Sequence, residues 1–359
     1  MFIERLELVD FRNYSEATFD LTSGTTAIIG RNAQGKTNVA EAMAFLATLE
    51  SFRGAPTAAL VRIGTEAAVI RAVIRQDDGR DTTIDVRIPA QGRVSVQVNK
   101  QRLQRSIDLL GALRVTVFSP DDLDLVKGGP AERRRFCDDV LVNLAARNGS
   151  LRLDLERALK QRNTLLRQCG GRLTDEVAFS LDVWDERMAE VGDRLGQARA
   201  ELVARMQPEA ERAYGELAGT PTAVGVRYEP EWRRTGLAEA LRQSRRDDVR
   251  RGSSTVGPHR DDVELTLGAL PARTHASQGE MRSLALSMRL AAHRMVADAV
   301  DAVPLLVLDD VLSELDPDRC RALLAHLPAG QVVITTATPL PTEAHPDRVI
   351  RIDGGKVAP

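Results

Sequence analysis

A glycine-rich segment near the amino end has the residue types and spacing of a phosphate-binding loop. Its residues are Gly30, Arg31, Asn32, Ala33, Gln34, Gly35, Lys36 and Thr37, which match the pattern G-x-x-x-x-G-K-T. Glycines let backbone N–H groups surround phosphate oxygens, while Lys36 can reach the β- and γ-phosphates and Thr37 can offer a hydroxyl to Mg²⁺. A chance glycine-rich turn is the weaker interpretation, because a β-prone run precedes the segment and helically spaced apolar residues follow it. The segment predicts binding of a nucleoside triphosphate with Mg²⁺.

Two adjacent carboxylates follow an apolar run at 305–308, which is typical of a strand buried on both faces of a parallel sheet. We expect Asp309 to bind the magnesium ion and Asp310 to polarise the water that attacks the γ-phosphate. The alternative role of Asp310 is to cap the turn that follows. Because aspartate is one methylene shorter than glutamate, we expect slow hydrolysis.

A third candidate site is the start of a helical pattern at about residue 278. Ser277 and Glu280 have the spacing of a capping box, which is a purely structural interpretation. The functional interpretation is that this helix start, with Gly279 in its first turn, binds a second anion such as a γ-phosphate. One nucleotide has only one triphosphate, and Lys36 already binds it. The second site is therefore predicted to serve the nucleotide of another subunit, in a dimer.

Two further segments combine charges with turn-forming residues. Asp316 and Pro317 have the types of a helix N-cap and first helical position, and the segment 313–317 could also contact another subunit. The segment 257–262 reads Gly-Pro-His-Arg-Asp-Asp. His259 is interpreted as a packed or exposed histidine rather than a ligand, because it has no partner at metal-ligand spacing.

The composition is that of an ordinary globular protein. Of 359 residues, 43% are hydrophobic and 28% charged. No apolar run approaches the roughly 18 residues that cross a membrane, and the amino end alternates like a strand rather than like a secretory signal. We therefore expect a cytoplasmic protein with no membrane partner. Cys137, Cys169 and Cys320 are too widely spaced for a disulfide framework or a metal site.

The formal net charge of −2 gives no indication of nucleic-acid binding, so DNA would have to meet a local basic surface. Arg53, Arg62 and Arg114 are candidate DNA contacts, because they lie near predicted loops or strand ends. The favoured alternative is that they are solvated surface arginines.

The periodicities predict an α/β domain interrupted by a helical insertion. Alternating segments within 67–98, separated by turn signals, predict an antiparallel β-meander. Apolar residues from Val177 to Leu202 alternate spacings of four and three, in a seam that ends near Pro208. This seam is typical of a plain helical bundle or of a short antiparallel coiled-coil arm. We predict a head made of residues 1–124 and 251–359 and a helical insertion of residues 125–250.

In order along the chain, these motifs resemble those of the SMC, Rad50 and RecF group of ABC ATPases, and the resemblance to the RecF family is close. It is carried by the segments 11–14, 35–38, 118–123, 126–130, 133–135, 257–261, 277–280 and 308–316. These segments span nearly the whole chain. The resemblance implies an α/β fold, with an ABC-type P-loop ATPase head, an antiparallel β subdomain and an inserted helical lobe resembling a short coiled coil.

The resemblance also implies an activity and partners. It implies a weak, DNA-dependent ATPase that forms a homodimer with ATP and Mg²⁺ and binds duplex DNA near gapped, single-stranded regions. Work with RecR and RecO in loading RecA during recombinational repair is implied as well.

Site residues follow from the resemblance, motif by motif. It implies that the loop from Gly30 to Asn38 binds ATP, that Thr37 and Asp309 bind Mg²⁺, that Lys36 and Asp310 are catalytic, that Ser277 and Gly279 act on the partner's nucleotide, and that Arg12 and Asn13 lie close to the nucleotide. Two parts of the wider ABC pattern have no counterpart. The segment 118–120 contains no glutamine, and Thr335 and Thr336 stand where a histidine would follow the run 332–334.

Three other interpretations are open. A chromosome-structural or break-tethering ATPase head would need a longer coiled coil than the seam of about 26 residues supplies. An ATPase subunit of a membrane transporter would not need the long helical insertion. ATP could also act mainly as a structural clamp on a DNA-binding mediator, with hydrolysis resetting it.

Overall fold

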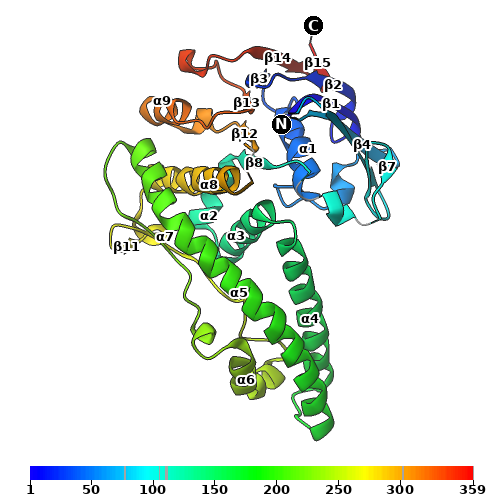
Figure 1. Cartoon of the computed structure of the whole chain (residues 1–359), viewed down its shortest axis with the longest axis vertical. Coiled ribbons are helices and arrows are strands. Elements are labelled where there is room, and N and C mark those ends of the chain that lie inside the picture. The colour runs from blue at the N-terminus through cyan, green and yellow to red at the C-terminus, as the bar shows by residue number, and fades with distance from the viewer. Residues whose placement is uncertain (77, 105, 110–111, 301–302, 359) are drawn as a thin grey trace. The chain divides into compact units, whose positions relative to one another are not determined.

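The computed structural model describes residues 1–76, 78–104, 106–109, 112–300 and 303–358. These residues divide into two compact units (Figure 1). The first unit consists of Met1–Leu123, Arg212–Pro221 and Ser277–Pro359, and the second of Asp124–Glu211 and Thr222–Ala276. Within the described ranges, no helix combines the length and the apolar character needed to cross a membrane.

One sheet of the first unit is antiparallel and confirms the predicted meander. Its strands, among the described residues, are β2 (Tyr14–Asp20), β1 (Phe2–Phe11), β4 (Ala67–Arg75), β5 (Asp81–Pro89), β6 (Ser95–Val98) and β7 (Gln101–Arg102), in that order. Residues alternate between buried and more exposed positions along β4 and β5, as expected for a sheet with one face on the core.

The other sheet of the first unit is parallel in its main part. Its described strands are β15 (Lys356–Val357), β14 (Arg348–Asp353), β3 (Thr25–Ile29), β13 (Val332–Thr336), β12 (Leu305–Asp309) and β8 (Val115–Phe118), in that order. All five residues of β12 are buried, which confirms the strand predicted from the apolar run. β3, β13 and β12 are neighbours (Figure 1), so the residues that follow their carboxyl ends meet at one edge.

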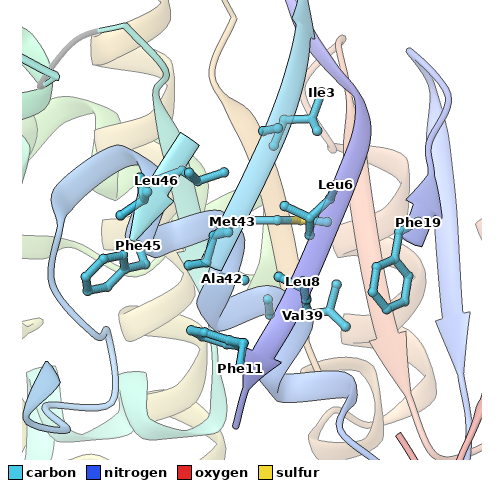
Figure 2. Close-up of a cluster of buried hydrophobic side chains, with 14 of the residues drawn as sticks. Ile3, Leu6, Leu8, Phe11, Phe19, Val39, Ala42, Met43, Phe45 and Leu46 are labelled. Carbon is cyan, nitrogen blue, oxygen red and sulfur yellow. The ribbon is translucent and has the colours of Figure 1, made fainter. Parts of the chain in front are cut away.

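Apolar side chains of α1 (Lys36–Thr48) pack in one core with both sheets. Figure 2 shows Val39 and Met43 of α1 among the β1 side chains Leu6, Leu8 and Phe11, and all five are fully buried. A second cluster joins β12 and β13 to α8 (Gln278–Val300) and α9 (Pro317–Ala325). The short 3-10 helices of this unit are η1 (Thr57–Leu60), η2 (Ser106–Leu109), η3 (Pro120–Asp122), η5 (Leu312–Glu314) and η6 (Thr342–Ala344).

The second unit is largely helical, as predicted. Its helices are α3 (Pro130–Leu144), α4 (Asn148–Gln168), α6 (Leu237–Arg251), α7 (Ala272–His275), η4 (Glu231–Arg234), most of α2 (Leu123–Lys127) and most of α5 (Asp175–Ala218). The predicted seam lies on α5, where Leu181, Met188, Val191, Leu195 and Leu202 are all buried. Leu181 packs with Leu166 of α4 and Val249 of α6, so three helices share this face.

The predicted end of the seam near Pro208 is wrong, because α5 continues through this proline to Ala218 with buried residues on both sides of it. Proline lacks the N–H that would bond to the fourth carbonyl before it, which costs about 3 kcal/mol in a helix interior. Met206 and Ala210, on either side, are fully buried. Their packing offsets the lost bond and keeps the chain helical.

A buried arginine connects the helices of the second unit. Arg162 of α4 is fully buried, and it donates from Nε to Asp185 at 2.6 Å and from Nη1 to Asp248 at 2.7 Å. Its Nη1 also donates to the Ser254 hydroxyl at 2.8 Å. Because buried charges are tolerated only when paired, this network fixes the register of α4, α5 and α6.

The two units differ from the predicted domains mainly in two places, because residues 212–221 belong to the first unit and residues 251–276 to the second. A small sheet of β9 (Val224–Arg227), β10 (Glu264–Leu267) and β11 (Leu270–Pro271) keeps residues as far as Ala276 in the second unit, and β9 had not been predicted. Arg133 strengthens this link by a bidentate ion pair with Asp262. The assignment of functional domains to these segments stays a prediction.

Candidate functional site

The phosphate-binding loop follows β3 and has a backbone that only glycine permits at two positions. A Cβ at Gly30 would lie 2.5 Å from the carbonyl oxygen of Ile352. Gly35 has φ 113°, and a Cβ there would lie 2.7 Å from the Asn13 amide and 2.8 Å from the Tyr14 hydroxyl. The loop is thus packed against the rest of the unit, with a shape that leaves no room for side chains at these points.

Lys36 is the first residue of α1 and is 6% exposed. Its Nζ donates to the carbonyl oxygen of Arg31 at 3.0 Å, so the ammonium group lies within its own loop. α1, which is described in full, begins without a side-chain cap and without an acidic residue in its first turn. The positive end of the helix and the ammonium group therefore both favour an anion at this loop.

Asn13 lies against the phosphate-binding loop, and its contact with the nucleotide, which the family resemblance implies, stays a prediction. Its Nδ2 donates to the carbonyl oxygen of Gln34 at 2.9 Å, and its Oδ1 accepts from Nδ2 of Asn38 at 2.7 Å. Tyr14, which sequence reasoning missed, donates its hydroxyl to the carbonyl oxygen of Gly35 at 3.0 Å. These bonds hold the loop from the side of β1 and β2.

Arg12 is held by an acidic residue of α1. It donates from Nε and Nη2 to the two carboxylate oxygens of Glu41, which is fully buried, and from Nη1 to the carbonyl oxygen of Ala59. Its φ is 55°, which is uncommon for a residue other than glycine. The guanidinium group is thereby fixed beside the helix that begins with Lys36, and its contact with nucleotide stays a prediction.

Asp309 lies at the carboxyl end of β12, is 3% exposed, and accepts from the Thr335 hydroxyl at 2.6 Å. Burial raises the pKa of its carboxyl, whereas hydrogen bonds from Thr335 and Thr37 and the charge of Arg53 lower it. β3, which leads into the phosphate-binding loop, and β12, which ends at Asp309, lie on either side of β13, so the loop and Asp309 share one edge of the sheet. A hydroxyl and a carboxylate side by side suit Mg²⁺, which in nucleotide sites takes one or two carboxylates together with phosphate and water oxygens.

Asp310 has φ 53°, a left-handed conformation. Its N–H donates to the carbonyl oxygen of Thr335 at 3.0 Å and to the Thr335 hydroxyl at 3.1 Å. The Ser313 hydroxyl donates to the carbonyl oxygen of Asp310 at 2.8 Å and to its Oδ1 at 3.1 Å. Asp310 therefore takes part in the following turn, and a second function in catalysis stays a prediction.

The start of α8 forms the predicted capping box. The Ser277 N–H donates to Oε2 of Glu280 at 2.7 Å, and the Glu280 N–H donates to the Ser277 hydroxyl at 3.3 Å. Hydrogen bonds that Ser277 donates, from its side chain and its backbone, lower the pKa of the Glu280 carboxyl. Ser277 is exposed, so the structural and functional interpretations are compatible. A Cβ at Gly279 would lie 2.9 Å from the guanidinium of Arg319.

The three candidate DNA arginines have different surroundings. The charge of Arg53 lowers the pKa of the Asp309 carboxyl, so this arginine acts electrostatically on the candidate magnesium site. Arg62 donates to Oδ1 of Asp10 at 3.4 Å, and burial lowers the pKa of Arg114. Their role in DNA binding stays a prediction.

His259 lies in the second unit as a packed histidine, as predicted. Its Nε2 shares a hydrogen bond with the carbonyl oxygen of Ser254 at 3.2 Å, and burial lowers its pKa to about 4. Asp261, two residues on, accepts from the Tyr228 hydroxyl at 2.5 Å and from the Trp232 indole at 2.8 Å. These bonds give the segment 257–262 a structural role in this unit.

Sequence reasoning assigned no function to Thr335 and did not mention Glu41. The sequence gives one indication for Thr335, which directly follows the apolar run 332–334. That run forms the strand beside β12. Glu41 had no such indication, because an acidic residue in a helix is ordinary unless its burial is known.

Comparisons with known proteins find the same family over almost the whole chain. A family model described as "RecF/RecN/SMC N terminal domain" matches residues 2–354. The DNA replication and repair protein RecF of Streptomyces avermitilis is 42% identical to this chain, over 94% of each chain. The RecF protein of Kineococcus radiotolerans is 40% identical to this chain, over 99% of each chain.

Solved structures are similar as well. A RecF–ATP structure, described as a recombination mediator protein in the RecFOR pathway, superposes with a TM-score of 0.91 at 27% identity, over 99% of this chain and 97% of that one. An Smc head bound to a domain of ScpA has a TM-score of 0.61 at 18% identity, over 100% and 97%. The second similarity concerns the fold alone, which is that of an ABC-type ATPase head.

Proposed function

Because this chain belongs to the RecF family of ABC-type ATPases, we propose that it is an ATP-dependent DNA-binding protein of recombinational repair. ATP binding drives its dimerisation on duplex DNA near single-stranded gaps, and slow hydrolysis resets it. It assists RecA loading together with RecR and RecO in the cytoplasm. The names of its relatives support this proposal, since they refer to DNA replication and repair and to a recombination mediator with ATP.

The observation that carries the ATPase part is the strand order of the parallel sheet, in which only β13 lies between β3, which leads into the phosphate-binding loop, and β12, which ends at Asp309. It brings the first turn of α1, the phosphate-binding loop and the carboxyl end of β12 to one place. Two residues with oxygen ligands are thus adjacent to a loop that is shaped for phosphate, although 272 positions separate them in the sequence, from 37 to 309.

Each site residue would have a separate role in ATP hydrolysis. Bound Mg²⁺ would supply positive charge at the phosphate oxygens. Lys36 and the N–H groups at the start of α1 bind the β- and γ-phosphates, while Thr37 and Asp309 hold the metal. Asp310 orients the attacking water and accepts its proton. Because the aspartate side chain is one methylene shorter than that of glutamate, turnover is slow.

Dimerisation would complete the site in trans. Ser277 is exposed and stands at the start of the long helix α8, whose N-terminal partial charge attracts anions. In the proposed dimer, Ser277 and Gly279 contact the γ-phosphate that is bound to the partner's phosphate-binding loop. ATP then acts as a bridge between two protomers, and its hydrolysis releases them.

The test is the mass in solution by light scattering, with and without ATP-Mg²⁺ and duplex DNA. The wild type should be a monomer that dimerises with ATP-Mg²⁺, whereas Ser277→Arg should bind nucleotide and stay monomeric, because the added side chain occupies the anion site. Ser150→Arg is the matched control, since Ser150 is also exposed near a helix start. A mass that is indifferent to ATP would refute the dimeric mechanism, as would weakened nucleotide binding by the Ser277→Arg monomer.

DNA binding is tested by fluorescence anisotropy with duplex and gapped oligonucleotides. If phosphate contacts carry the affinity, it should fall by at least tenfold between about 50 and 200 mM salt. Replacing Arg53, Arg62 or Arg114 by alanine should weaken binding by similar factors on all sequences, if they contact phosphates. Affinity that is unaffected by ATP, or by all three substitutions, would contradict this part of the proposal.

A further inference from the structure

Thr335 is a fully buried threonine, the last but one residue of β13, and it contacts both Asp309, which ends β12, and Asp310, which follows it. Its hydroxyl donates to Oδ1 of Asp309 at 2.6 Å and accepts from the N–H of Asp310 at 3.1 Å. Its carbonyl oxygen also accepts from the N–H of Asp310, at 3.0 Å. A single residue of the neighbouring strand thus makes three hydrogen bonds to the two residues with the proposed metal-binding and water-activating roles.

The chemistry of a hydroxyl suits this arrangement. It has one proton, which is directed at the Asp309 carboxylate, and two lone pairs, one of which receives the Asp310 N–H. The bond to a carboxylate is the stronger kind, because the acceptor is charged. It occupies Oδ1 of Asp309 and limits the rotation of the carboxylate that also contacts Thr37.

The hydrogen bonds to Asp310 stabilise a backbone conformation of this residue that is otherwise unfavourable. Its φ of 53° lies in the left-handed region, which residues with a Cβ avoid. Such conformations persist where surrounding bonds over-determine them, and they gather at functional sites. Here the Thr335 carbonyl and hydroxyl hold the N–H of Asp310, while the Ser313 hydroxyl holds its carbonyl oxygen. The direction of the Asp310 side chain depends on this turn.

We propose that Thr335 is a positioning residue of the ATPase site. It fixes the Asp309 carboxylate relative to Thr37 and fixes the backbone turn that presents Asp310. The inference rests on the proposed function, because it assigns to Thr335 the geometry of the metal-binding and water-activating residues. Thr335 itself touches neither nucleotide nor metal in this role.

The test compares Thr335→Val, which keeps the shape and removes the hydroxyl, with Thr335→Ser, which keeps the hydroxyl. Binding of a fluorescent ATP analogue is titrated with Mg²⁺, and hydrolysis is followed separately. Thr335→Val should need about 10- to 100-fold more Mg²⁺ for the same binding, as is typical when a residue that orients a metal ligand is lost. Its nucleotide affinity without Mg²⁺ should be unchanged, because the phosphate-binding loop is intact. Its kcat should fall while KM in saturating Mg²⁺ changes little.

Thr335→Ser should restore the Mg²⁺ requirement to within about threefold, which a packing role of the methyl group would not predict. Thr26→Val is the matched control, since Thr26 is fully buried in the same sheet and its hydroxyl bonds to Thr22 rather than to a carboxylate. It should keep the wild-type Mg²⁺ requirement. If Thr335→Val does not fold, Thr335→Ala removes the hydroxyl without crowding and supplies the same comparison.

Three outcomes would overturn the inference. They are a wild-type Mg²⁺ requirement in Thr335→Val, the same defect in Thr335→Ser as in Thr335→Val, and the same defect in Thr26→Val. These outcomes are distinguishable from a failure of the proposed function, in which the wild type itself would show no Mg²⁺-dependent binding of ATP.

Discussion

The guanidinium of Arg12 and the carboxylate of Glu41 form a bidentate pair, with Nε–Oε2 at 2.8 Å and Nη2–Oε1 at 2.7 Å. Glu41 is fully buried in α1, and the Arg12 side chain is 19% exposed. The Ser51 hydroxyl donates to Oε1 of the same carboxylate at 2.5 Å. The end of β1, the middle of α1 and the loop after α1 are therefore fixed to one another beside the phosphate-binding loop.

Glu41→Gln is expected to lower the free energy of unfolding by about 2 to 3 kcal/mol, because a charged hydrogen-bonded acceptor is replaced by a neutral one. Urea denaturation measures this loss. Glu16→Gln, at an exposed position on β2, is the control and should unfold like the wild type. Equal midpoints for Glu41→Gln and the wild type would show that the buried pair contributes nothing to stability.

Lys36→Arg is expected to bind ATP within a few-fold of the wild type and to lose hydrolysis. The positive charge remains, but the planar guanidinium cannot take the position of an ammonium that lies inside the loop. Equilibrium binding and phosphate release measure the two effects. Lys100→Arg, at an exposed turn, should keep normal turnover. Wild-type turnover in Lys36→Arg would contradict the role assigned to Lys36.

Arg162→Met is expected to destabilise the second unit by about 3 to 5 kcal/mol, because it leaves the fully buried carboxylate of Asp248 without its cation. The urea midpoint should shift accordingly. Arg157→Met changes an arginine of the same helix whose side chain is 75% exposed, and it should have little effect. If both variants unfold alike, the buried network does not hold the helices together.

The stability of the first unit is expected to fall as the pH falls from about 6.5 to about 4. His293 is fully buried, and burial lowers its pKa to about 4. Above about pH 6.5 the residue is neutral in both states. Below that pH, His293 binds a proton in the unfolded chain but stays neutral in the folded chain. The free energy of unfolding therefore falls by about 1.4 kcal/mol per pH unit, and by roughly 3 kcal/mol at pH 4.

Urea midpoints between pH 7.5 and pH 4.5 test this dependence. His293→Gln cannot titrate, so its midpoint should fall less steeply with pH than that of the wild type, even if it is less stable at pH 7.5. His326→Gln removes an exposed histidine and should retain the wild-type slope. Parallel curves for His293→Gln and the wild type would exclude His293 as a source of the pH dependence.

The elements predicted with success were those whose signal is local. The glycine spacing at 30–37, the apolar run at 305–308 and the capping box at Ser277 each lie within a few residues, and the same short-range rules act in the folded chain. One prediction was wrong and one strand was missed, for a different reason. The continuation of α5 through Pro208 and the formation of β9 were decided by packing, which overrides local preference.

By itself, the sequence determined that a phosphate-binding loop, an apolar strand ending in two carboxylates and a capped helix start exist in this order, because residue type and spacing suffice for each. Only the tertiary structure decided which side chains support them. Thr335 and Asp309 are separated by 26 positions and Arg12 and Glu41 by 29, on elements that meet only when the sheets and α1 pack. Such contacts depend on strand order and on burial. Both are set by residues far apart in the sequence, so no local sequence pattern predicts them.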